Sequence, residues 1–188
     1  YMRVISSYIQ YNQDCFEEHA NFVYTTKPNS VCKFSNLEFD VNISFGRYGE
    51  RNYISKSQNN DIKRKILVLG DSHAMGWGVS DDEIFTSHLS KFGIKSLNLA
   101  ISSYGTVREL ERLEIFSKLY PSIYKQYKTI LIQYHENDAS ENQRFFRGEK
   151  ILRPSIKTID QYKSDLYRKN YKNPLTQKKY SKISNFCK

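Results

Sequence analysis

The sequence predicts an α/β domain with a parallel sheet and helices on both faces, preceded by an irregular N-terminal extension. Between residues 65 and 142, apolar runs typical of buried strands alternate with segments of helical spacing. By contrast, residues 1–60 have no sustained periodicity and are dense in Asn, Ser, Pro and Gly. We expect them to pack on, or lead into, the domain that follows. A length of 188 residues suits one such domain with an extension.

Three strands are predicted. The first, residues 66–69, is a continuous apolar run ending at Gly70, as expected for a strand buried on both faces of a parallel sheet. The others fit residues 94–100 and 129–134. Strands that alternate with helices pair in parallel through right-handed crossovers. Ligands of such sheets bind at the carboxyl ends of the strands, so the residues there are the first candidates for a functional site.

Two helices are predicted between these strands. Ser80 and Glu83 have the spacing of a capping box, with Ser80 as the N-cap and Glu83 reaching back. An apolar stripe follows and ends at Gly93; it consists of Phe85, Leu89 and Phe92. The second helix fits residues 107–119 and is closed by Pro121. Its apolar stripe, which we expect to face the core, consists of Val107, Leu110, Leu113, Phe116 and Leu119.

Composition excludes several classes of protein. The chain is 39% hydrophobic and 26% charged, as in soluble globular proteins, and no run approaches the roughly 20 apolar residues of a membrane span. Cys15, Cys32 and Cys187 have no CxxC spacing, so a zinc ribbon is not supported. Cys15 and Cys32 form a disulfide in an oxidising compartment or are two buried thiols, and the sequence leaves both alternatives open.

The net charge of +9 is concentrated in the last quarter of the chain. Residues 143–188 contain 13 basic and 3 acidic side chains, interleaved with tyrosines. Such a tail suits a phosphate backbone, an anionic glycan or a membrane surface. The ordinary alternative is a solvated helix and loop. We favour the latter and expect no nucleic-acid partner, because no pattern of a known nucleic-acid-binding module accompanies the charge.

Polar residues of unusual chemistry follow each predicted strand, in segments 70–73, 98–105 and 135–138. A serine just beyond a buried strand, such as Ser72, exposes its hydroxyl above the sheet edge. Its own N–H can stabilise an oxyanion there. The carboxamide of Asn137 and N–H groups from the second segment can add further donors. A nucleophile with converging donors is half of a site for acyl transfer.

These three segments resemble the motif blocks of the SGNH (GDSL-like) hydrolases. Gly70-Asp71-Ser72 is the first block, within KILVLGDSHAMGWGVSDDEIF. The stretch NLAISSYGT is similar to the second, with Asn98 and Gly105 in register, and HEND at 135–138 matches the third in part. The resemblance implies a three-layer α/β/α domain with a parallel, flavodoxin-like sheet. We assign this domain to residues 61–188 and the extension to residues 1–60.

The resemblance also assigns roles to the residues of these blocks. Ser72 is the nucleophile, and Asp71 orders the loop that holds it. The oxyanion hole is formed by the N–H of Ser72, a turn N–H at Ser103 and the side chain of Asn137. We expect the substrate site to be lined by His73, Gly105, His135 and Asp138.

The chain departs from the family's pattern in three places. Ser103 and His135 stand where the second and third blocks have glycine. The family's base and its orienting acid come from an Asp-x-x-His motif, and no such motif follows Asn137. We therefore expect the domain to be incomplete at its C-terminal end. His135 is an alternative base, although a structural role is the more common one for such a histidine, and His73 is expected to pack locally.

The leading functional interpretation is a serine-dependent ester hydrolase or O-acyltransferase that acts on acyl esters, such as those of carbohydrates, through an acyl-serine intermediate. The alternative is a non-catalytic glycan-binding module. No cofactor is expected, and no metal, since a site made of His73, His88 and His135 lacks a ligand motif. A periplasmic or cell-envelope location, with any membrane anchor outside this chain, completes the interpretation.

Overall fold

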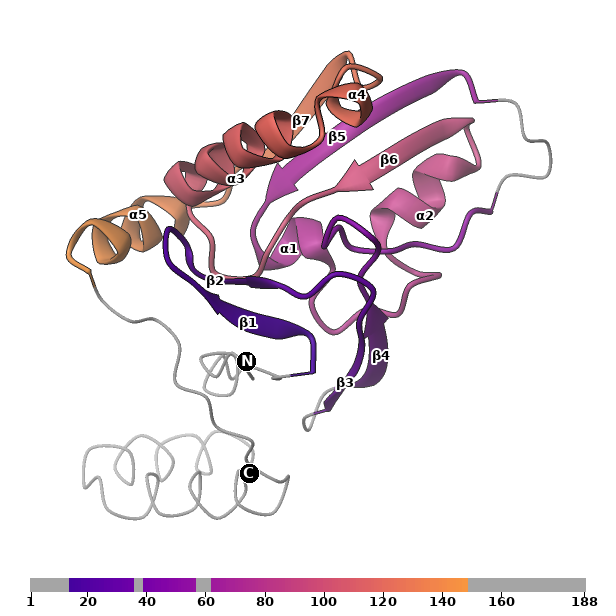
Figure 1. The fold of residues 1–188 in the computed structure, drawn as a ribbon. Helices are drawn as coiled ribbons and strands as arrows, with labels where there is room; N and C mark the ends of the chain where they lie inside the picture. Colours follow the sequence, from indigo (N-terminus) through magenta and orange to yellow (C-terminus); the bar gives the residue numbers. More distant parts are fainter. Residues whose placement is uncertain (1–13, 36–38, 57–61, 149–188) are drawn as a thin grey trace, which may run out of the picture. The chain divides into compact units, whose positions relative to one another are not determined.

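A computed structural model describes residues 14–35, 39–56 and 62–148 (Figure 1). In chain order the elements are β1 (Phe16–His19), β2 (Val23–Thr26), β3 (Val31–Ser35), β4 (Asp40–Ser44), β5 (Arg64–Gly70), α1 (Ser72–Met75), α2 (Phe85–Ser90), β6 (Ile94–Asn98), α3 (Thr106–Leu119), α4 (Pro121–Tyr124), β7 (Thr129–Gln133) and α5 (Asp138–Phe146). Most of the basic tail lies outside the described residues.

The fold is mixed α/β, with a three-stranded parallel sheet of order β6-β5-β7 flanked by helices. This confirms the three predicted strands and their parallel pairing. In the registers, Val68 of β5 lies opposite Asn98 of β6, and Gly70 lies opposite Gln133 of β7. The carboxyl ends of the three strands therefore meet at one edge of the sheet, as the sequence predicts.

The central strand β5 is buried on both faces, as predicted. Ile66 and Val68 belong to a hydrophobic cluster that also contains residues of α1 and of the N-terminal hairpins. Leu67 and Leu69 belong to a second cluster with Phe116 of α3. Successive side chains of a strand point to opposite faces, so the uninterrupted apolar run supplies both layers of the core.

The described residues between 14 and 56 form two antiparallel strand pairs, the hairpins β1–β2 and β3–β4. The rings of Phe34 and Phe45 both meet the ring of Phe16 edge to face. All three belong to the same cluster as Ile66 and Val68 of β5. The N-terminal segment is therefore part of the core beneath the sheet, held there by apolar burial.

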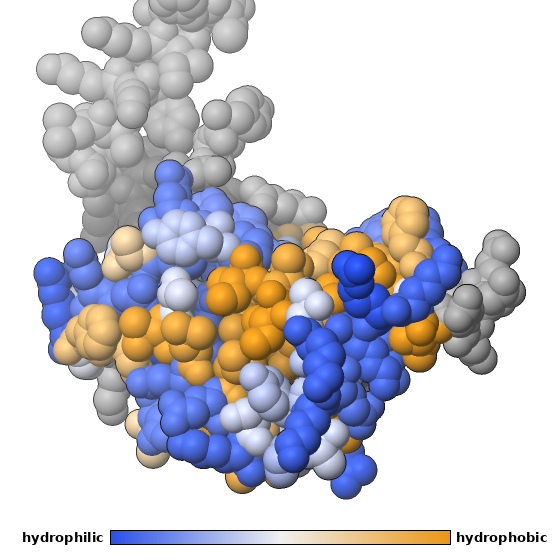
Figure 2. Space-filling model, turned by 90° about the horizontal axis from the view of Figure 1, so that it is seen from above, coloured by the Kyte–Doolittle hydropathy of each residue, from blue (hydrophilic) through white to orange (hydrophobic). Residues whose placement is uncertain are grey.

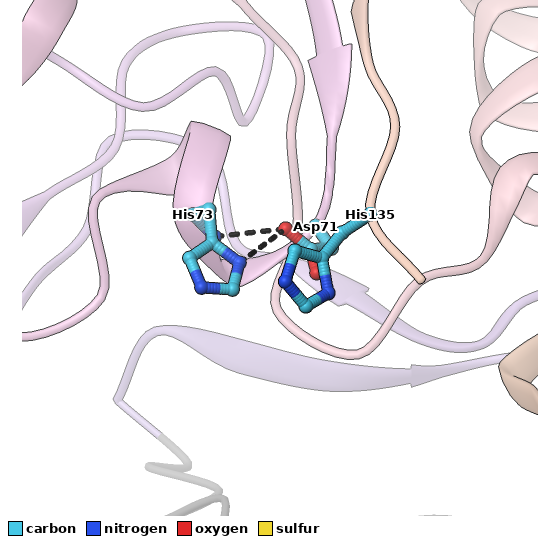
Figure 3. Close-up of side chains that lie close together, drawn as sticks. All are labelled: Asp71, His73 and His135. Carbon is cyan, nitrogen blue, oxygen red and sulfur yellow. Dashed lines mark hydrogen bonds and ion pairs between the residues drawn. The ribbon is translucent and has the colours of Figure 1, made fainter. Parts of the chain in front are cut away.

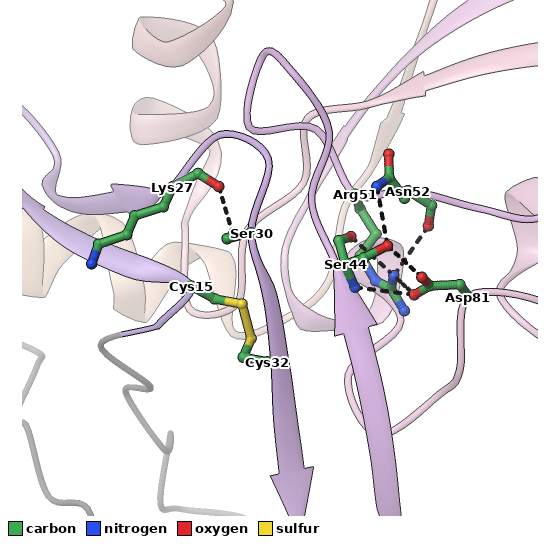
Figure 4. The surroundings of a disulfide bond; sticks show 8 residues. All are labelled: Cys15, Lys27, Ser30, Cys32, Ser44, Arg51, Asn52 and Asp81. Atoms are coloured by element: carbon green, nitrogen blue, oxygen red, sulfur yellow. Dashed lines mark hydrogen bonds and ion pairs between the residues drawn. A yellow bond between two sulfur atoms is a disulfide. The ribbon is translucent and has the colours of Figure 1, made fainter.

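A disulfide between Cys15 and Cys32 joins the two hairpins, which settles the alternatives that the sequence left open (Figure 4). We expect reduction to lower the free energy of unfolding by about 3 kcal/mol, because the bond closes a loop with a sequence separation of 17. Urea denaturation with and without a reductant measures this. A Cys187→Ser variant, which keeps the bond, should unfold like the wild type without reductant. Equal urea midpoints for the oxidised and reduced proteins would contradict the prediction.

The predicted capping box is wrong. Helix α2 has Ile84 as its N-cap, with no side-chain hydrogen bond. Instead, the hydroxyl of Ser80 donates to Asp82 at 2.6 Å, within a turn that precedes the helix. The helix also ends at Ser90, so Phe92 lies beyond it and is 69% exposed. A tertiary contact holds this turn in place, because the carboxylate of Asp81 in the turn binds Arg51.

Helix α3 forms as predicted, but much of its predicted apolar stripe does not face the core. Leu110 and Leu119 are exposed, although Phe116 is buried. The other buried residues of the helix are charged; they are Arg108, Glu109 and Arg112. Arg112 donates to the hydroxyl of Thr25 at 2.7 Å and to the carbonyl of Gly49 at 2.9 Å. This face of α3 is polar because the N-terminal segment presents hydrogen-bond acceptors to it.

Strand β7 pairs only with β5 among the described residues, and its apolar side chains stay partly exposed. They are Ile130, Leu131 and Ile132, with exposed fractions of 40–45%. Figure 2 looks down on the side of the molecule where β7 and α4 lie and shows a band of hydrophobic residues across it. Within the described ranges, no helix is both long and apolar enough to cross a bilayer.

Candidate active site at the carboxyl ends of the strands

The turn after β5 requires glycine at its first position. Gly70 has φ +153°, and a Cβ atom there would lie 2.5 Å from the Cβ of Ala74 and 3.2 Å from that of Gln133. The chain can therefore turn directly from β5 into α1 only without a side chain at this position. The turn places Asp71 as the N-cap of α1 and Ser72 as the first helical residue.

Asp71 connects the first segment of the site to the third. Its side chain is fully buried, and its Oδ1 accepts the backbone N–H of His73 at 2.9 Å. Its Oδ2 accepts a hydrogen bond from Nδ2 of Asn137 at 3.1 Å. A carboxylate held by two donors fixes the turn that carries Ser72 relative to the loop after β7.

Ser72 is partly exposed at this edge of the sheet. Its carbonyl accepts the N–H of Trp77 at 2.9 Å, which holds the backbone of the turn. Its hydroxyl has no hydrogen-bond partner among the described residues. The hydroxyl is thus not hydrogen-bonded to either histidine of the site in this structure.

The loop after β7 folds as a tight turn around Asp138. The N–H of His135 donates to the Asp138 carboxylate at 3.2 Å, and the N–H of Asp138 donates back to the His135 carbonyl at 3.0 Å. The ring of His135 bonds through Nδ1 to Oδ1 of Asn137. It also stacks on the ring of His73, with centroids 4.4 Å apart. The two histidines, both predicted to line the substrate site, lie together beside Asp71 (Figure 3).

The loop after β6 supports the site from the other side. Nδ2 of Asn98 donates to the carbonyl of Ala74 in α1 at 2.8 Å, and its Oδ1 accepts the N–H of Ala100 at 3.0 Å. The N–H of Ile101 donates to the carbonyl of Gly70 at 3.1 Å. These bonds attach the loop to the turn after β5.

Ser103 and Gly105 occupy this loop in different ways. Ser103 has φ +60°, the left-handed conformation that glycine adopts most easily, and its carbonyl accepts from Arg108. Gly105 is the N-cap of α3, and a Cβ atom there would lie 2.8 Å from the carbonyl of Asp138. Gly105 therefore permits the close approach of α3 and α5, and its place in the substrate site stays a prediction.

Sequence reasoning missed a buried carboxylate behind the site. Glu109 of α3 is 2% exposed, and neither carboxylate oxygen has a hydrogen-bond partner among the described residues. Burial, together with the charges of Asp138 and Asp71, raises the pKa of Glu109 to about 8, against a smaller lowering by Arg108. Burial likewise raises the pKa of Asp138.

Arg108 is the cation that opposes the raised pKa of Glu109, and it also contacts a further acid, Glu141. Its Nη2 lies 3.6 Å from Oε2 of Glu141, whose other oxygen, Oε1, lies 3.5 Å from Nη1 of Arg144. The guanidinium also sits over the ring of Tyr104, 4.6 Å from its centroid. The sequence signal for this network was the group of charged residues Arg108, Glu109 and Arg112. The prediction relied instead on the apolar stripe of the helix.

Comparisons with known proteins give no guide to the function of this site. No family model matches this chain, and no curated protein matches it. A fold of this class accommodates many activities, so the function has to be argued from the side chains at the edge of the sheet.

Proposed function

We propose that this chain contains the nucleophile and the oxyanion-binding residues of a serine-dependent ester hydrolase or O-acyltransferase. The supporting observation is that Ser72 begins a helix directly after the central strand, while Asn137 reaches the same turn through Asp71 at 3.1 Å. The resemblance to SGNH hydrolases supports the same assignment. We further propose a three-layer, flavodoxin-like domain, since β6-β5-β7 is the order of the first three strands in such sheets.

In the proposed reaction the hydroxyl oxygen of Ser72 attacks the ester carbonyl carbon and loses its proton to a base. The N–H groups of Ser72 and Ser103 and the amide of Asn137 stabilise the oxyanion. The bond from carbonyl carbon to alkoxy oxygen then breaks, and the alcohol leaves with a proton. Water or a sugar hydroxyl takes the acyl group from Ser72, which regenerates the serine.

Two side-chain movements are implied by this proposal. Nδ2 of Asn137 donates to Asp71 in this structure, so it has to turn away from that carboxylate to reach an oxyanion. A proton acceptor also has to reach Ser72, and His73 and His135 are the two imidazoles beside it in the described part of the chain. Apo sites commonly have such loose catalytic contacts, which tighten when substrate binds.

We propose acyl esters such as those of carbohydrates as substrates. The disulfide between Cys15 and Cys32 supports a location in an oxidising compartment, such as the periplasm or cell envelope. Any membrane anchor is proposed to lie outside this chain.

A fluorophosphonate probe tests the proposed nucleophile. We expect the wild type to be labelled and Ser72→Ala to lose labelling, while Ser122→Ala, at an exposed position remote in sequence, is labelled like the wild type. Loss of the base should slow labelling at least about tenfold, so His73→Ala and His135→Ala distinguish the two imidazoles. Undiminished labelling of a folded Ser72→Ala variant would overturn the assignment.

The alternative proposal is a glycan-binding module without turnover. The observation that favours it is the hydroxyl of Ser72, which has no base bonded to it among the described residues. This alternative predicts that the folded wild type is not labelled but still binds O-acetylated glycans, and that Ser72→Ala binds them as well.

A further inference from the structure

Asp71, His73 and His135 form a compact group of metal-ligating side chains. One carboxylate oxygen and one nitrogen from each ring lie within 4.8 Å of one another (Figure 3). Asp71 lies in the turn after β5, His73 lies in α1, and His135 lies in the loop after β7. The parallel sheet thus gathers three ligands that are separated by up to 64 residues in the chain, from residue 71 to residue 135.

The distances within the group fit a small divalent ion. Nδ1 of His73 lies 3.3 Å from Oδ1 of Asp71. Two ligands of a tetrahedral ion with bonds of about 2.0–2.1 Å are separated by about 3.3 Å, so this pair already has the required spacing. The ligand nitrogen of His135 lies within 4.8 Å of both other ligand atoms and completes the set.

The surroundings also hold the ligands as a metal site requires. The contact of His135 Nδ1 with Oδ1 of Asn137 leaves its Nε2 free to bind an ion. Asn137 also donates to Oδ2 of Asp71, so one amide orients two of the three ligands. Such outer contacts fix the tautomer and direction of metal-binding side chains.

Charge at this edge of the sheet favours a cation. The side chain of Asp71 is completely buried, so a bound cation would offset the cost of holding a carboxylate away from water. The side chain of His73 is 59% exposed, so an ion could enter from solvent.

We propose that Asp71, His73 and His135 bind a divalent transition-metal ion such as Zn²⁺. Two imidazoles and one carboxylate suit zinc and its neighbours, whereas Mg²⁺ and Ca²⁺ prefer sites made of oxygen ligands. Three protein ligands leave one position open to water or another small ligand. The sequence predicted no metal, because a site made of His73, His88 and His135 lacks a ligand motif. The structure instead pairs His88 with Glu83 at 3.6 Å and places Asp71 in the group with His73 and His135.

Zn²⁺ titration against a chromogenic chelator tests the proposal on the whole chain. We expect one equivalent to bind, and His73→Ala and His135→Ala each to weaken the affinity at least about tenfold. His88→Ala removes a histidine outside the group, and Cys187→Ser removes the cysteine outside the disulfide; both should bind like the wild type. Circular dichroism confirms that each variant is folded.

A second measurement identifies the ligands directly. Co²⁺ in place of Zn²⁺ should give visible absorption that changes in His73→Ala and in His135→Ala but not in His88→Ala. The proposal is overturned if the folded wild type binds no ion, if both variants bind like the wild type, or if His88→Ala loses the site. Ion binding needs neither Ser72 nor an ester, so this result is independent of the labelling of Ser72.

Discussion

Replacing Asp81 with alanine should lower the free energy of unfolding by about 3–5 kcal/mol, the usual cost of leaving a buried charge without its partner. Asp81 accepts from the guanidinium of Arg51, which is only 1% exposed (Figure 4). The same carboxylate accepts from the hydroxyl and the N–H of Ser44. The substitution therefore also removes the acceptor of these two hydrogen bonds from Ser44 of β4.

Among its described contacts, Arg51 has no carboxylate other than that of Asp81. Its remaining hydrogen bonds go to the carbonyls of Ser44, Asn52 and Val79, which do not neutralise its charge. The backbone of Arg51 also forms an isolated β-bridge with Asn98. Loss of the Asp81 carboxylate should therefore weaken the contact between the N-terminal segment and β6. The network joins three parts of the chain, and this connection is why we expect a large effect.

Urea denaturation of Asp81→Ala and Asp82→Ala provides the measurement with its control. Asp82 is adjacent in the chain but accepts from the hydroxyl of Ser80 within the same turn. We expect Asp82→Ala to unfold near the wild-type urea concentration. If the two variants were destabilised equally, Arg51 would not depend on Asp81 as we describe.

The parts of the fold that could be predicted from the sequence are those specified by local patterns. The apolar run before Gly70 predicted a strand buried on both faces, and the structure confirms it with clusters on either side. The alternation of strands and helices predicted the parallel pairing, because a crossover through a helix leaves few other arrangements. The stop at Gly70 also predicted where the turn would lie.

The errors arose where a distant partner overrides a local signal. Residues 80–83 have the pattern of a capping box, but Asp81 binds Arg51, which lies 30 residues earlier in the chain. Arg112 of α3 is buried because it meets the hydroxyl of Thr25, a separation of 87 residues. No pattern within one helix reveals which acceptors another segment will present to it.

At the candidate site, too, the contacts set by the topology could be predicted, and those set by the conformation of the loops could not. The prediction that strand ends meet at one edge brought Asp71 and Asn137 together correctly, since that follows from the topology alone. The sequence also placed His73 and His135 at this edge, but the stacking of their rings beside Asp71 was not predictable, because the direction of a side chain in a loop depends on the turn that holds it. His88 was considered with His73 and His135, and only the structure distinguishes it from them.

Replacing Glu109 with glutamine should stabilise the protein increasingly as the pH rises. The pKa of Glu109 is about 8 in the folded chain, compared with 4.5 for an ordinary glutamate, chiefly because the side chain is buried. Between these values the folded state binds a proton that the unfolded state does not, so wild-type stability falls as the pH rises. Glutamine stays neutral and avoids this loss.

The free energy of unfolding of Glu109→Gln, compared with the wild type from pH 4 to pH 9, measures the effect. The two proteins should have similar stability at pH 4, and the variant should be more stable by on the order of 4 kcal/mol near pH 8, since each pKa unit corresponds to about 1.4 kcal/mol. Above pH 8 the difference should level off, because both states of the wild type are then ionised.

Glu114→Gln on the same helix gives a control of opposite sign. Glu114 is exposed, and its hydrogen bond with Lys118 lowers its pKa, so ionisation favours the folded state there. The variant should show a small loss of stability at neutral pH, lost as the pH falls through the range where carboxylates protonate. A stability difference between Glu109→Gln and the wild type that stayed constant from pH 4 to pH 8 would mean that Glu109 is already ionised within the fold. The buried carboxylates behind Asp71 would then be compensated by charges other than Arg108.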